Sequence, residues 1–123
     1  NMLVAKISPA AQKIIQKTPF EQEVLTGEYM IVQCNKYVIG SVVGTHNDEN
    51  YFELKFGNIK YEQNPDGSNS KPMLDTVVSQ RLKLTTPEVE NWGTDDSVVF
   101  DIIAQKLGIN IVELQTLDMQ FTL

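Results

Sequence analysis

Alternation of apolar and polar residues is clearest in the middle of the chain and predicts β-strands there. Phe52, Leu54 and Phe56 alternate with polar residues, a period of two that is typical of a strand with one buried face. Runs rich in β-branched and aromatic residues have the same preference. Together these patterns predict the strands of an antiparallel meander at 28–33, 37–43, 51–62 and 73–84. A hairpin turn is expected at 34–36 and a longer loop at 64–72.

The N-terminal region has a spacing that favours helices. Ser8 followed by Pro9 is a helix-start signal. The apolar residues that follow share one side of a helix: Ala10, Ala11, Ile14 and Ile15. Thr18 and Glu21 have the spacing of a capping box. Two short helices are therefore expected before the first strand.

A longer helix is expected at Asp96–Leu107, with acidic residues in its first turn and Gly108 at its end. A second helical piece is expected at 111–117. The alternation over 117–123 predicts a last strand. The predicted fold is therefore α+β, with four to five strands, short N-terminal helices and a helix-turn-helix-like pair before the C-terminal strand.

The segment Ile103–Ile109, followed by Leu114 and Leu117, resembles the helix-turn-helix of DNA-binding regulators. That resemblance implies a closely crossing pair of helices, with Gly108 in the turn and the second helix on DNA. The same stretch is also similar to the helical half of peptidoglycan-binding LysM modules. Acidic residues such as Glu113 are unfavourable beside phosphate, and no Lys or Arg follows Lys106.

Length, charge and cysteine content limit the remaining possibilities. The 123 residues fit one domain, with Asn1 ahead of Met2 interpreted as a remnant of cloning. The net charge is −6, which disfavours sequence-independent binding of nucleic acid. Cys34 is the single cysteine, and the apolar runs are far shorter than a membrane span. We therefore expect a cytoplasmic protein, in a cell or an infected host cell, without membrane contact.

No residue pattern indicates a catalytic, cofactor or metal site. His46 lies in a polar stretch without the spaced partners that a metal ion needs. Asp96 and Asp101 are interpreted as helix-start residues, since Ca²⁺-loop spacing is missing. Cys34 is interpreted as a packing residue because no base and orienting group accompany it. The prediction is a protein that is not an enzyme and binds no cofactor.

The leading functional hypothesis is a protein–protein interaction or assembly protein, of the small acidic kind that bacteria and phages encode. Its partner is another protein or a second copy. The residues expected at the partner surface are Trp92, Ile111, Val112, Phe121 and Leu123. The alternative is a nucleic-acid-binding module that uses residues 103–117 or a strand face. That face combines basic and aromatic residues: Lys55, Lys60, Tyr61, Arg81 and Lys83.

Overall fold

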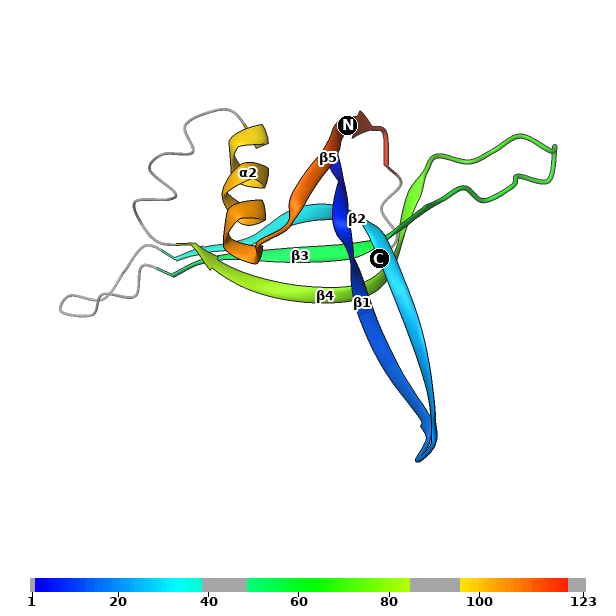
Figure 1. Cartoon of the computed structure of the whole chain (residues 1–123). Helices are drawn as coiled ribbons and strands as arrows, with labels where there is room; N and C mark the ends of the chain where they lie inside the picture. The colour runs from blue at the N-terminus through cyan, green and yellow to red at the C-terminus, as the bar shows by residue number, and fades with distance from the viewer. Residues whose placement is uncertain (1, 39–48, 85–95, 120–123) are drawn as a thin grey trace.

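A five-stranded antiparallel sheet and one helix make up the described part of the chain, residues 2–38, 49–84 and 96–119, in a computed structural model (Figure 1). The strand order is β4-β3-β2-β1-β5, so that β4 and β5 form the two edges. In chain order the elements are β1 (Met2–Thr18), β2 (Glu21–Val38), β3 (Glu49–Lys60), β4 (Met73–Leu84), α2 (Asp96–Leu107) and β5 (Asn110–Leu117).

One face of the sheet holds the main core, and α2 covers it. Phe52, Leu54 and Phe56 point to this face from β3, as their alternation predicts, and all three are buried. Phe100 and Ile103 from α2 pack into the same cluster. Burial of these large apolar side chains is the main source of stability for a domain of this size. The predicted ranges 73–84 and Asp96–Leu107 agree with β4 and α2.

A smaller apolar cluster lies apart from the main core. Val4, Ile31 and Met119 are its buried members. Partly buried residues from other strands pack around them, among them Tyr29, Ile59, Leu74 and Leu117. The sheet is thus partly covered on both faces, and the one helix of the described ranges lies on the main-core face.

The predicted N-terminal helices are wrong. Residues 2–18 form the single long strand β1, which pairs antiparallel with β2. Thr18 does not start a helix: its Oγ1 accepts a hydrogen bond from the Phe20 N–H (3.2 Å) within a tight hairpin turn. The apolar spacing over 10–15 fits either element locally, and pairing along β2 decides for the strand.

The predicted helix-turn-helix pair is also wrong. Its first helix is α2, and Gly108 follows that helix with a φ of +69°, a conformation that glycine adopts readily. Residues 110–117 then form β5 and pair with β1 from Met2 to Ser8. The fold is therefore mostly β and not α+β.

A further correction concerns the turn expected at 34–36, because β2 continues through these residues to Val38. The register between β2 and β3 shifts between Cys34 and Lys36, so the chain forms a bulge there and not a reversal. The predicted loop at 64–72 does separate β3 from β4. His46, and the last strand beyond Met119, lie outside the described residues.

Candidate protein interaction site

The outer halves of β1 and β2 form a two-stranded arm, which no other strand among residues 2–38, 49–84 and 96–119 extends. Pairing with β5 ends at Ser8, and pairing with β3 begins at Tyr29. Residues 9–27 are called the arm below; the strand pairs within them run from Ala11–Gly27 to Thr18–Glu21, and in the described part of the chain they pair with no other strand. Figure 1 shows the arm projecting away from the rest of the sheet, with the β1–β2 turn at its tip.

The arm exposes large apolar side chains. Ile14 and Val24 lie directly opposite each other in the β1–β2 register, with 60% and 51% of their surface exposed. Phe20, in the turn, is 94% exposed. A two-stranded hairpin is at best marginally stable alone in water, and clustered exposed apolar residues mark interaction surfaces. The arm is thus the strongest candidate for a partner contact in the described chain.

Polar contacts near the tip hold the turn together. Gln22 Nε2 donates a hydrogen bond to Gln16 Oε1 across the strands (3.0 Å). Lys17 Nζ and Glu23 Oε2 form an ion pair at 2.9 Å, with both side chains about half exposed. Such exposed contacts contribute little energy each. They keep the two strands in register while the apolar side chains remain open to solvent.

The base of the arm is tightly fixed by backbone packing. A Cβ atom added to Gly27 would lie 2.7 Å from the backbone nitrogen of Gly57. Asn58 replaces the missing strand pairing: its Nδ2 donates to the Thr26 carbonyl (2.8 Å), and its Oδ1 accepts from the Glu28 N–H (3.3 Å). The direction in which the arm leaves the sheet is therefore set by two glycines and one amide side chain.

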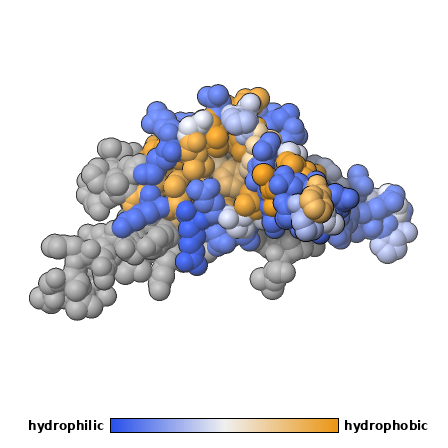
Figure 2. Space-filling view, turned by 60° about the horizontal axis from the view of Figure 1, so that its bottom comes forward, coloured by the Kyte–Doolittle hydropathy of each residue, from blue (hydrophilic) through white to orange (hydrophobic). Residues whose placement is uncertain are grey.

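An uncharged hollow of about 280 Å³ lies beside the base of the arm. Its lining comes from β1, β3, β4 and the C-terminal end of α2: Ile7, Pro9, Ala10, Ala11, Gln12, Phe56, Val78, Gln80, Leu107 and Ile109. None of these residues is charged, and only Gln12 and Gln80 have polar side chains. Figure 2 shows hydrophobic atoms gathered in the middle of the molecule on its lower side, with hydrophilic atoms around them.

The residues that the sequence indicated for partner binding are dispersed or outside the described chain. Trp92, Phe121 and Leu123 fall outside the described residues. Ile111 is partly buried and packs against the main core. Val112 is 60% exposed, where the register between β1 and β5 shifts. The arm residues were missed because their exposure depends on where β3 and β5 stop pairing, which no local pattern reveals.

The basic residues predicted on one strand face divide between two faces. Lys55 pairs with Ser79, and Arg81 and Lys83 follow at alternate positions of β4, so these three cations share a face. Glu53 pairs with Arg81 and puts a negative charge among them. Lys60 lies five residues beyond Lys55 and so falls on the other face. Tyr61 follows the end of β3 and is 53% exposed.

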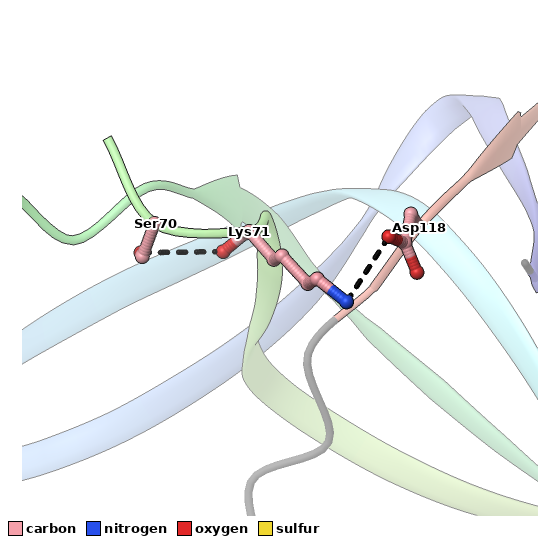
Figure 3. A network of polar contacts seen from close by, with 3 residues as sticks. All are labelled: Ser70, Lys71 and Asp118. Carbon is pink, nitrogen blue, oxygen red and sulfur yellow. Dashed lines mark hydrogen bonds and ion pairs between the residues drawn. The ribbon is translucent and has the colours of Figure 1, made fainter. Parts of the chain in front are cut away.

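Polar contacts away from the arm stabilise the loop between β3 and β4. Lys71 Nζ forms an ion pair with Asp118 Oδ2 at 3.2 Å, which joins the β3–β4 loop to the segment after β5 (Figure 3). Hydrogen bonds from the Ser68 hydroxyl and backbone N–H lower the pKa of Asp66 below its ordinary value. Within the described ranges no group of three or more His, Cys, Asp or Glu residues is placed to hold a metal ion.

No protein-family profile, curated protein or solved structure matched this chain. In the part of the chain that the structure describes, no helix has the length and apolar character needed to cross a membrane.

Proposed function

We propose that this chain is a non-enzymatic interaction or assembly protein and that the arm is its docking element. The observation that carries the proposal is the unsupported ribbon of residues 9–27, with Ile14, Val24 and Phe20 open to solvent. Burial of such a side chain contributes up to about 1.5–3 kcal/mol of favourable free energy, which the exposed side chains of the arm gain only when the arm docks. A fixed base favours binding further, because less conformational entropy is lost when a rigid element docks.

The chemistry of the hollow supports binding over catalysis. Its lining has no acid, base, hydroxyl or thiol group, whereas general acid–base and nucleophilic catalysis need such groups within hydrogen-bond reach of the substrate. Apolar walls with two amides at separate points suit an apolar side chain.

The partner in this proposal is a protein or a second copy, met in the cytoplasm. The reducing environment there suits a chain whose sequence has one cysteine. Projecting strands are a common means of protein contact, since their free backbone groups accept a further strand. The outer edges of the arm offer such groups along both β1 and β2.

The test compares two variants of equal charge. Ile14→Lys with Val24→Lys places cations on the exposed apolar pair, and Thr76→Lys with Gln105→Lys places them on exposed positions of β4 and α2. Immobilised protein is incubated with lysate of the source cell, and bound proteins are quantified. Sedimentation measures self-association of the same samples. We expect at least a tenfold loss of binding or self-association for the arm variant alone, with both variants keeping the far-ultraviolet circular dichroism of the original chain.

Equal binding by the arm variant and the original chain would contradict the proposal. Retention by the arm variant with loss in the β4 and α2 variant would instead place the contact on the body of the protein. Both comparisons require that the variants are folded, which the circular dichroism spectra verify.

Nucleic-acid binding is a second candidate, favoured by one observation. The register between β3 and β4 puts Lys55, Arg81 and Lys83 on one face. Single-stranded DNA that binds with a steep salt dependence, and is lost when these three residues become alanine, would favour this function. The net charge of −6 and the position of Glu53 make it the weaker candidate.

A further inference from the structure

The arm and the hollow provide a projecting apolar side chain and an uncharged recess on the same molecule. Phe20 is almost fully exposed at the tip of the arm, and the hollow lies at its base. The two features are complementary in chemistry: an aromatic side chain without charge, and a recess whose lining is uncharged. This complementarity raises the question of which molecule supplies the occupant of the hollow.

The protein's own Phe20 cannot fill the hollow. Gln12 lines it, and Phe20 lies eight residues further along the chain at the end of the extended strand. Eight residues of strand span about 26 Å at roughly 3.3 Å per residue. Bringing the tip back would break the β1–β2 pairs from Gln12–Thr26 to Thr18–Glu21. A Phe20 side chain in the hollow must therefore come from another molecule.

We propose that the arm of one copy inserts Phe20 into the hollow of a second copy. This inference rests on the proposed function and specifies the partner. A hollow of about 280 Å³ is slightly smaller than the ~300–1,000 Å³ typical of small-molecule sites. It therefore suits one large side chain better than a drug-sized ligand.

Charge supports a second copy as the partner. The arm has two lysines, Lys13 and Lys17, and two glutamates, Glu21 and Glu23, so its net charge is zero. The rest of the chain carries the whole −6. Like charges repel when two acidic proteins approach. A neutral arm that meets an uncharged hollow brings two copies together through the parts that repel least.

The contact joins two different surfaces, so it repeats. Each copy donates one arm and offers one hollow, an arrangement that produces rings where the rotation closes and filaments where it does not. One inserted side chain buries far less than the ~800 Å² per partner of a standard interface. A single contact is therefore weak, and a closed ring is stabilised because the contact that closes it is intramolecular.

The test uses substitutions at two exposed positions. Phe20→Ser removes the inserted side chain, and Gln80→Glu places a charge at the hollow with almost no change of shape. Gln105→Glu on the exposed side of α2 is the matched control. Sedimentation equilibrium of the full chain is measured from about 10 to 500 μM. We expect mass to increase with concentration for the original chain and the control, and association at least tenfold weaker for each of the other two variants.

Mixing the two defective variants provides the decisive measurement. Phe20→Ser keeps an intact hollow and Gln80→Glu keeps an intact arm, so the equimolar mixture has one productive contact. We expect it to form a one-to-one dimer and nothing larger. An original chain that stays monomeric, or a mixture that forms no dimer although each variant is folded, would overturn the inference. If the original chain stays monomeric yet binds another protein through Ile14 and Val24, the proposed function stands and only the second copy is excluded.

Discussion

The inner and outer halves of β1 and β2 are built from the same two strands but lie in opposite environments. In the inner half Ala5 and Met30 pair with each other and are fully buried, with β5 and β3 on either side. In the outer half Ile14 and Val24 also pair but remain more than half exposed. The comparison shows that strand pairing alone does not bury side chains, since burial needs a further layer or a further strand.

The largest expected effect tests this comparison by removing one apolar side chain from each environment. Leu54→Ala, at a fully buried position of β3, should lower the free energy of unfolding by about 2–5 kcal/mol because it leaves a cavity. Ile14→Ala, in the arm, should change it by no more than about 0.5 kcal/mol, as for other surface substitutions. Urea unfolding followed by circular dichroism measures both. A loss at Ile14 as large as that at Leu54 would mean that the arm is covered in solution.

The next effect concerns Gly57 of β3, which packs against Gly27 at the base of the arm and against β4 on its other side. A Cβ added to Gly57 would lie 2.1 Å from the Asp75 carbonyl oxygen, which is backbone and cannot rotate away. Gly57→Ala should therefore destabilise the protein by about 1–3 kcal/mol, as overpacking does. Thr76→Ala, on the exposed side of β4, is the control. Similar unfolding midpoints for the two variants would contradict the close packing of the β3 and β4 backbones at Gly57.

The smallest effect should distinguish the local stability of the arm from that of β3 and β4. Asn58→Ala removes the hydrogen bonds to Thr26 and Glu28, and each such bond contributes about 0.5–1.5 kcal/mol. We expect faster amide hydrogen exchange within residues 11–27 and unchanged exchange in β3 and β4. A uniform increase in exchange rate over the whole chain would indicate that the arm and the rest of the sheet unfold as one unit.

Sequence patterns predicted the elements whose burial is periodic. Asp96–Leu107 and 73–84 agree with α2 and β4 because each has one covered face and clear boundaries, such as Gly108 after the helix. These features depend on residues close together in the chain.

The remaining elements depend on distant pairing. Residues 10–15 have apolar spacing that fits a helix, but residues 11–16 pair with residues 22–27 of β2. Residues 111–117 likewise join β1 across almost the whole chain. The candidate site was missed for the same reason, because the exposure of Phe20 and Ile14 depends on where β3 and β5 stop pairing, beyond which no described residue adds a third strand to the arm. The close approach of β2 and β3 at Gly27 is likewise a contact between distant segments.

The pairing of β5 with β1 means that the sheet is completed only late in the synthesis of the chain. Met2 pairs with Leu117, which leaves the ribosome 115 residues later. At about 5–20 residues per second, this delay is about 6–23 s. The β1–β2 hairpin forms in microseconds once both strands have emerged. The edge of β1 that later pairs with β5 therefore stays unpaired for nearly all of this delay. Neighbouring nascent chains on one messenger RNA therefore meet with this edge unpaired, and close spacing of ribosomes would favour misassembly before β5 arrives.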